Sequence, residues 1–253
     1  MTQETVTETA RLTEVMRAWC AAHPYSTLDI FLGASAEHGD RLSPRPGVCF
    51  TLNTAFASHL NEVGVPSSVH LAGVQDHDSP DAADVGSHLT VVAQLDGQPH
   101  LTDVGLGCGP LTPIPLRPGT HSFNGFDFPL TTHARDGQRW WRLGIPPALS
   151  RAFRAMEFCE VPDDPRAGAR AGHFLSPATS PLRDVLLIQG WVGERLVTAH
   201  GPTVTVRSSE GVLARTTFED QSAWQSAVHG WFPDTFGEAE LSAAWARLQG
   251  LRA

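Results

Sequence analysis

Two hydrophobic periodicities divide this sequence, and their order limits the folds that it can adopt. Up to about residue 66 the apolar residues recur every three or four positions, which is typical of amphipathic helices. Beyond that point, short strand-like runs are separated by turn-forming residues, which is typical of antiparallel strands. The tail returns to helical patterns near 219–230 and 237–250. This segregation of helices and strands predicts an α+β protein.

The N-terminal part contains three predicted helices. The first covers residues 8–22, where four apolar residues lie at helical spacing, and it ends before a His-Pro pair. A short helix is expected at 29–33. The third runs from about residue 48 or 49 to 62 and is followed by a glycine and a proline, which are typical after a helix end.

The β part contains one hairpin whose turn can be located from the sequence. HLTVVAQL (88–95) and QPHLTDVGL (98–106) flank Asp96-Gly97, a pair that favours a two-residue hairpin turn. Other strands are predicted at 67–75, 139–144, 154–161, 184–192, 194–208 and 212–218. We therefore divide the chain into a helical domain, a β domain and a mixed domain, at residues 1–66, 67–160 and 161–253.

The charged residues and the cysteines exclude several classes of function. The chain has 253 residues and a net charge of −9, which argues against a nucleic-acid partner. All 18 basic residues are arginine, so no lysine is available for catalysis, and any bound phosphate must contact arginine, backbone N–H groups or hydroxyls. No apolar run reaches the roughly 18 residues of a membrane helix, and the start lacks a signal-peptide pattern. The 4 cysteines contain no C-x-x-C pair, which predicts free thiols in a reducing, cytoplasmic setting.

One acidic loop is a candidate metal site, but its spacing argues against metal binding. Its side chains are Asp76, His77, Asp78, Asp81 and Asp84. The spacing fits no EF-hand loop, and a proline interrupts it. We therefore predict a solvated loop and no bound metal.

Cys49 is the candidate nucleophile. It opens the third predicted helix, where unpaired backbone N–H groups and the positive end of the helix dipole favour a thiolate. A lone cysteine at such a position is more often just a small buried residue, so the position alone predicts little.

His88 and Asp103 lie on the same hairpin and strengthen this hypothesis. A two-residue turn at Asp96-Gly97 pairs residues whose numbers sum to 193, so Asp103 faces Thr90. His88 is two residues from Thr90, so the histidine and the aspartate share one face as diagonal neighbours. That separation suits a carboxylate that orients an imidazole. Together with a cysteine at a helix start, the pair predicts a Cys-His-Asp triad.

The segments that carry these residues resemble those of the arylamine N-acetyltransferase family. RPGVCFTLN at 45–53 is similar to the family's R-G-G-x-C-x-E-x-N segment, and LTDVGLG at 101–107 is similar to its D-V-G-F-G strand. The interval of 15 residues from His88 to Asp103 is also the family's. PYSTLD at 24–29 resembles the family's P-F-E-N-L-D segment.

The resemblance extends over roughly residues 10–250, since residues 173–181 resemble the start of the family's third domain. The triad is retained, whereas several residues around it differ from the family pattern: Ser26, Thr27, Pro46, Thr51 and Leu106 stand where the family has Glu, Asn, Gly, Glu and Phe. These differences concern the binding of the acyl donor and the acceptor.

The resemblance implies an N-terminal helical bundle, a central antiparallel β-barrel-like domain, a C-terminal α/β lid and a papain-like arrangement of the triad. It implies that an acyl group passes from a CoA thioester such as acetyl-CoA to Cys49, and then to an arylamine, hydrazine or related amine. Substrate contacts are expected from Tyr25 and Leu106, and donor contacts from Gly105, Gly107 and Cys108. A plain bend between strands and ordinary core packing are the competing explanations for these glycines and for Tyr25.

Other functions remain open from the sequence. One is an amide synthase that takes a larger acyl group from an acyl carrier protein. Another is a thiol hydrolase or transglutaminase-like enzyme that uses the same triad. A non-catalytic binding protein is a further alternative, against which the intact triad argues.

Overall fold

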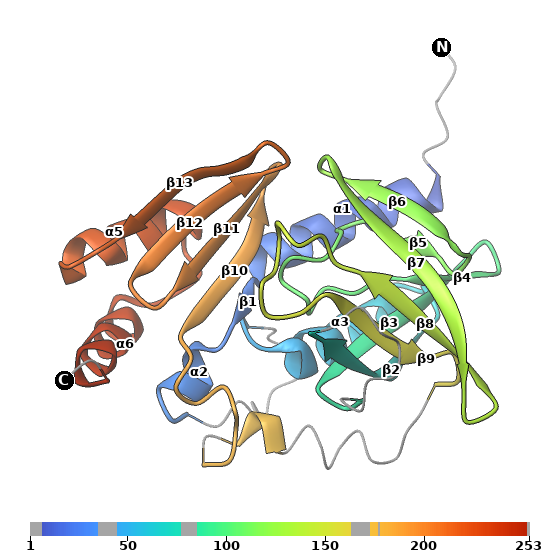
Figure 1. Cartoon of the computed structure of the whole chain (residues 1–253), viewed down its shortest axis with the longest axis horizontal. Helices are drawn as coiled ribbons and strands as arrows, with labels where there is room; N and C mark the ends of the chain where they lie inside the picture. The colour runs from blue at the N-terminus through green and yellow to red at the C-terminus, as the bar shows by residue number, and fades with distance from the viewer. Residues whose placement is uncertain (1–6, 35–44, 77–84, 163–172, 177, 252–253) are drawn as a thin grey trace.

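The molecule contains two antiparallel sheets with helices packed beside them (Figure 1). A computed structural model describes the chain at residues 7–34, 45–76, 85–162, 173–176 and 178–251. Over these ranges, one sheet has eight strands and the other has five. The predicted α+β class is confirmed.

Three helices form the N-terminal part: α1 (Glu8–Ala22), α2 (Leu28–Phe31) and α3 (Cys49–Glu62). α1 begins after Thr7, whose hydroxyl accepts a hydrogen bond from the N–H of Ala10 at 3.2 Å. α3 packs against β2 and β3 and buries its apolar side, which includes Phe50, Phe56 and Leu60. The bounds of α1 and α3 agree with those expected from the periodicity and the stop signals.

The eight-stranded sheet has the order β5-β4-β3-β2-β9-β8-β7-β6 and curls into an almost closed, barrel-like layer. Its strands are β2 (Ser67–Gln75), β3 (His88–Leu95), β4 (Gln98–Leu101), β5 (Ile114–Pro115), β6 (Gly119–Phe123), β7 (Phe126–Arg135), β8 (Gln138–Gly144) and β9 (Ala155–Cys159). All neighbours pair antiparallel, and two-residue turns join β3 to β4, β6 to β7 and β7 to β8.

The β6–β7 hairpin was not predicted from the sequence. Its turn is Asn124-Gly125, and both residues have positive φ, at 49° and 75°, as a two-residue hairpin turn requires. The Asn-Gly pair was therefore a usable signal. Proline has no N–H to donate, so Pro129 within β7 argues against a strand in the middle of a sheet. It lies where β7 pairs with β6 alone, since the pairing with β8 starts at Leu130.

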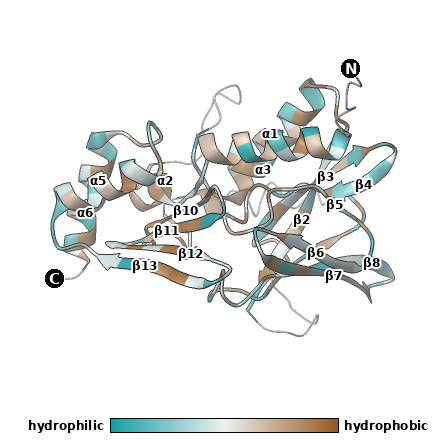
Figure 2. Cartoon of the chain, turned by 90° about the horizontal axis from the view of Figure 1, so that it is seen from above, coloured by the Kyte–Doolittle hydropathy of each residue, from teal (hydrophilic) through white to brown (hydrophobic). Residues whose placement is uncertain are grey.

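The five-stranded sheet has the order β1-β10-β11-β12-β13. Its strands are β1 (Tyr25–Ser26), β10 (Leu187–Val192), β11 (Arg195–His200), β12 (Thr203–Ser208) and β13 (Gly211–Thr217). Helices α5 (Gln221–Trp231) and α6 (Glu238–Gly250) cover one of its faces (Figure 2). β1 and α2 belong by sequence to the predicted helical domain, yet they pack with this sheet. The three-domain division stays a prediction.

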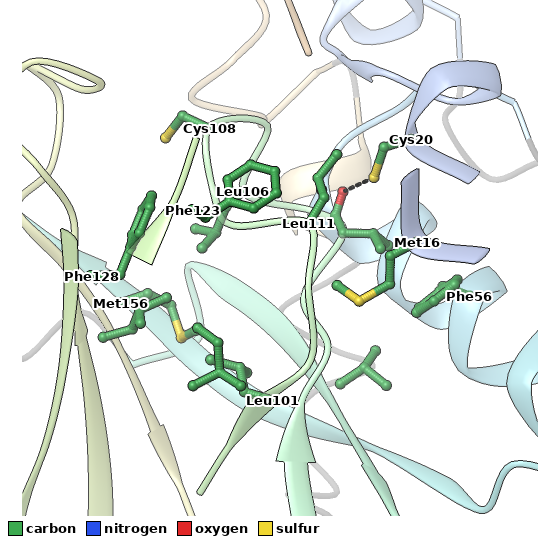
Figure 3. Close-up of a cluster of buried hydrophobic side chains, with 14 of the residues drawn as sticks. Met16, Cys20, Phe56, Leu101, Leu106, Cys108, Leu111, Phe123, Phe128 and Met156 are labelled. Carbon is green, nitrogen blue, oxygen red and sulfur yellow. Dashed lines mark hydrogen bonds between the residues drawn. The ribbon is translucent and has the colours of Figure 1, made fainter. Parts of the chain in front are cut away.

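A large apolar core joins α1, α3 and the eight-stranded sheet. Figure 3 shows part of it, with Met16 and Phe56 from the helices and Phe128 and Met156 from the strands. Trp191 of β10 extends this core to the five-stranded sheet, since its ring packs against Phe123 and its indole N–H donates to the carbonyl of Gly109 at 2.8 Å.

Two predicted features fall wholly or partly outside the described residues. Most of the acidic loop, at 77–84, and most of the segment that links the second and third predicted domains, at 163–172, are among them. Within the described ranges, no helix has the length and apolar character needed to cross a membrane.

Candidate active site

Cys49 is the first residue of α3. The preceding residue, Val48, is extended, with φ −87° and ψ 169°, and has no side chain that can cap the helix. The first-turn N–H groups therefore have no side-chain cap from this position. Thr51 turns its hydroxyl back to the carbonyl of Val48 at 2.8 Å. The cysteine is 6% exposed, and its sulfur lies 4.0 Å from the carbonyl oxygen of Ser87, next to His88.

The β3–β4 hairpin has the register predicted from its turn. Asp96 and Gly97 have φ values of 50° and 71°, and the ladder pairs Leu95 with Gln98 and Val92 with Leu101. The pairing places His88 and Asp103 close together, with 2.7 Å between His88 Nε2 and Asp103 Oδ2.

His88 and Asp103 form a buried ion pair, with side chains 3% and 2% exposed. Burial alone would lower the pKa of His88, but the charge of Asp103 and then that of Cys49 outweigh it and raise this pKa to about 10. Although burial acts in the opposite direction, the interaction with His88 lowers the pKa of the Asp103 carboxyl. Both shifts favour imidazolium beside carboxylate at neutral pH.

The turn after β4 brings Asp103 and Cys49 together. Asp103 Oδ1 accepts the N–H groups of Gly105 and Leu106 at 2.7 and 3.0 Å. Gly105 lies so close to α3 that a Cβ there would be 2.8 Å from Cys49 Cα. The charge of Cys49 is one of the causes that raise the pKa of His88, so the thiol lies close to the imidazole. The structure thus brings the three predicted triad residues into one contiguous cluster.

Tyr25 and Gly107 lie beside this cluster. Gly107 has φ +69°, and a Cβ there would be 3.0 Å from Tyr25 Cβ and 2.9 Å from Gln189 Oε1. Burial raises the pKa of Tyr25 well above its usual range, and the neighbouring Cys49 adds to this shift. Tyr25, Gly107 and Gln189 line one small pocket next to Asp103.

Leu106 and Cys108 point into the apolar core, as Figure 3 shows. Their exposed fractions are 5% and 0%, and burial raises the pKa of Cys108 to about 12. Contacts from these two residues to a substrate or donor stay predictions, and backbone atoms would have to make them. Of the other two cysteines, Cys20 is buried and Cys159 is partly exposed.

Two residues at the site were not assigned to it from the sequence. Gln189 comes from β10, some 140 positions after Cys49 in the sequence, and no local pattern marks it. Asn53 lies one helical turn after Cys49, and its amide contacts both other triad segments. Its place in the 45–53 motif was the available signal. Among the described residues, no group of His, Cys, Asp or Glu could hold a metal ion.

The fold resembles solved arylamine N-acetyltransferases over nearly the whole chain. The enzyme of Nocardia farcinica matches with a TM-score of 0.81 and 21% identity, covering 98% of this chain and 92% of that one. The Salmonella typhimurium enzyme matches with a TM-score of 0.75 and 18% identity, covering 97% and 94%. The Mycobacterium marinum enzyme in complex with CoA matches with a TM-score of 0.73 and 18% identity, covering 98% and 95%.

Sequence comparison gives the family. No curated protein sequence matches the chain significantly. The family model described as N-acetyltransferase matches residues 9–140, which is more than half of the 253 residues and includes all three residues of the cluster. On these grounds the chain is a divergent member of the arylamine N-acetyltransferase family.

Proposed function

We propose that the chain transfers an acetyl group from acetyl-CoA to an arylamine through an acyl-enzyme at Cys49. The observation that carries this proposal is the buried hydrogen bond of 2.7 Å between His88 and Asp103, with Cys49 Sγ 4.0 Å from the carbonyl oxygen of Ser87, the residue before His88. A nucleophile, a base and a group that orients the base are the parts that such a reaction needs.

In the first step, the Cys49 thiolate attacks the thioester carbonyl while His88 carries the proton and Asp103 stabilises the imidazolium. The tetrahedral intermediate breaks its bond to the CoA sulfur, and the departing thiolate takes the proton from His88. In the second step, neutral His88 accepts a proton from the amine as the amine attacks the acyl-enzyme. The C–S bond breaks, and Cys49 returns as a thiolate beside protonated His88.

An arginine cluster supports CoA as the carrier of the acyl group. Burial lowers the pKa of Arg207 in β12, and repulsion from the nearby Arg151 and Arg215 lowers it further. Within the described ranges, no ion pair with a carboxylate is recorded for these three residues. In a chain of net charge −9, such a cluster suits the phosphate groups of CoA.

A polar row connects that cluster to the triad. The register of the five-stranded sheet aligns Gln189, Thr198, Thr205 and Arg215 across four strands, so these side chains share one face. Gln189 donates to Thr198 at 2.9 Å and lies against Gly107 beside the triad. Three strand spacings separate the ends of the row by roughly 14 Å. A pantetheine arm along this row would place the phosphates at the arginines and the thioester near Cys49.

Apolar side chains around Cys49 support an aromatic acceptor. Cys49 packs in a cluster with Phe50, Leu71 and Leu89, and Phe174 stacks on Phe50 at 5.2 Å between ring centroids. Aromatic rings favour such offset contacts. Tyr25, Gly105 and Gly107 would contribute from the other side of the nucleophile, the glycines through their backbone.

Intact-mass spectrometry after incubation with acetyl-CoA tests the proposal. The wild type should gain one acetyl group, and an added arylamine should remove it. Cys49→Ser should gain none while keeping its circular-dichroism spectrum. Cys159→Ser should behave as the wild type, because this partly exposed thiol donates to Gln138 of β8.

The other outcomes decide among the alternatives. Acylation by a carrier-protein thioester but not by acetyl-CoA would favour an amide synthase. An acyl-enzyme that water clears as fast as amine does would favour a hydrolase. No adduct with any acyl thioester would contradict the proposal.

A further inference from the structure

The β3–β4 ladder is interrupted at one rung beside the triad. Its last regular backbone bond runs from the N–H of Thr102 to the carbonyl of Val91 at 2.9 Å. Paired residues in this hairpin have numbers that sum to 193, as Val91 and Thr102 do. The next hydrogen-bonded pair in this register would therefore be Leu89 and Val104. No ladder pair forms there, because β4 ends at Leu101.

The side chain of Asn53 takes the place of the missing bond. Val104 donates its N–H to Asn53 Oδ1 at 2.9 Å, and Asn53 Nδ2 donates to the carbonyl of Leu89 at 2.5 Å. The amide has the donor and acceptor of a peptide group, so it fits between the two backbones as an inserted rung. Asn53 is 0% exposed, which makes both hydrogen bonds costly to lose.

The inserted amide links all three segments of the triad. Leu89 directly follows His88, Val104 directly follows Asp103, and Asn53 lies one turn after Cys49 on α3. A Cβ at Gly105 would be 2.5 Å from Asn53 Nδ2 and 2.9 Å from Cys49 Cβ, so the same amide is packed against the turn and the nucleophile. A shift of the amide would therefore change the distances among the three reacting groups.

We propose that Asn53 is a positioning residue of the active site, whose side-chain amide separates the β3 and β4 backbones by one rung and sets the placement of His88 and Asp103 against Cys49. If the amide were absent, Val104 N–H and Leu89 C=O would be unpaired or would bond directly to each other. Direct bonding would draw the Asp103 turn toward β3 and away from the start of α3. The proposal rests on the proposed function, because it assigns Asn53 to the same triad.

The pH profile of Cys49 alkylation tests this role without any acyl donor. Iodoacetamide labelling at Cys49, followed by peptide mass spectrometry from mildly acidic to mildly alkaline pH, reports how well imidazolium supports the sulfur. In Asn53→Ala, the pH midpoint should rise and acetyl transfer should fall about 10²-fold, as expected for a small misplacement of catalytic groups. Asn53→Asp keeps the size and the acceptor but loses the donor to Leu89, and it should shift the midpoint in the same direction.

Asn61→Ala is the matched control. Asn61 lies on the same helix and also ties it to a strand, since it accepts the N–H of Ser67 at 3.0 Å and donates to the Ser67 carbonyl at 3.2 Å, but it is remote from the triad. Its loss should lower the melting temperature and leave the alkylation profile unchanged.

Three outcomes are informative. A shifted profile in both Asn53 variants, with the Asn61 profile unchanged, supports the proposal; if Asn53→Ala does not fold, Asn53→Asp decides. A wild-type profile in folded Asn53 variants that lose only thermal stability overturns the positioning role alone. Wild-type Cys49 that reacts no faster than Cys159 overturns the proposed function, and the positioning role with it.

Discussion

Asp103 uses both oxygens of its carboxylate for different partners. Oδ2 binds Nε2 of His88, while Oδ1 accepts two backbone N–H groups of the following turn. The turn therefore fixes the plane of the carboxylate, and the carboxylate fixes the plane of the imidazole. The other ring nitrogen, Nδ1, is left for Cys49.

The pairing of His88 with Asp103 predicts a pH-dependent stability. The pKa of His88 rises from 6.5 to about 10 on folding, so its stabilising contribution is complete below pH 6.5 and is lost as the pH rises through about 10. The pKa of Asp103 is lowered on folding, so its stabilising contribution is complete above pH 3.8 and is lost in stronger acid. The melting temperature of the wild type should therefore exceed that of Asp103→Asn most between pH 3.8 and 6.5, and the difference should narrow as the pH rises toward 10.

Thermal melts across this pH range measure the difference, with Asp127→Asn as the control. Asp127 is an exposed carboxylate that accepts a hydrogen bond from Ser122, and its variant should follow the wild type at every pH. Asp103→Asn should also lose most acetyl transfer, because a neutral amide does not stabilise imidazolium. A constant difference in melting temperature up to pH 10 would contradict the assigned ion pair.

At the scale of elements, the site depends on how closely the turn after β4 approaches α3. Gly105→Ala adds a methyl group 2.5 Å from Asn53 Nδ2 and 2.8 Å from Cys49 Cα. We expect it to destabilise the fold by about 1–3 kcal/mol through overpacking and to slow transfer, because the nucleophile must move. Differential scanning fluorimetry and initial rates measure the two effects.

Gly230→Ala is the matched substitution within a helix. Gly230 lies inside α5, and nothing is within 4 Å of the position that its Cβ would occupy. Alanine should therefore stabilise by up to about 1 kcal/mol through helix propensity and leave the rate unchanged. If Gly105→Ala were as stable and as active as Gly230→Ala, the turn after β4 would not be in tight contact with α3.

The elements that local patterns determine could be predicted from the sequence. α1, α3 and the β3–β4 register follow from apolar spacing, stop signals and one turn dipeptide, and the register places His88 near Asp103. The approach of Cys49 to this pair depends on the packing of α3 against β3, which no local pattern specifies. β1 could not be predicted, because its two residues are defined as a strand by pairing with β10, far along the chain. The same holds for Gln189, and for the partners of Asn53, which lie in segments that the helix pattern does not specify.

At the scale of the molecule, Trp191 and the turns of two hairpins join the two sheets. Trp191 packs on the β6–β7 hairpin, and Asn124 in the turn of that hairpin donates to the carbonyl of Gly193 at 3.2 Å. A Cβ at Gly125 would be 2.5 Å from Ser209 Oγ, so the turns of two hairpins also touch. Arg151 comes from the loop after β8, whereas Arg207 and Arg215 come from the other sheet, so the cluster exists only when both sheets are in place.

The arginine cluster therefore predicts that its loss weakens the binding of a CoA donor and leaves the acyl-transfer step itself unchanged. Arg207→Gln should raise the KM for acetyl-CoA about tenfold, as expected for the loss of a charge-assisted contact to phosphate, with a smaller salt dependence than in the wild type. With an uncharged activated ester such as p-nitrophenyl acetate, the same variant should acylate Cys49 at the wild-type rate. Arg195→Gln, on exposed β11 surface outside the cluster, should match the wild type with both donors. An equal loss of activity with both donors would indicate a disturbed fold, and no loss with either donor would place the phosphates elsewhere. Only a loss of activity confined to the CoA thioester agrees with a donor that spans the two sheets.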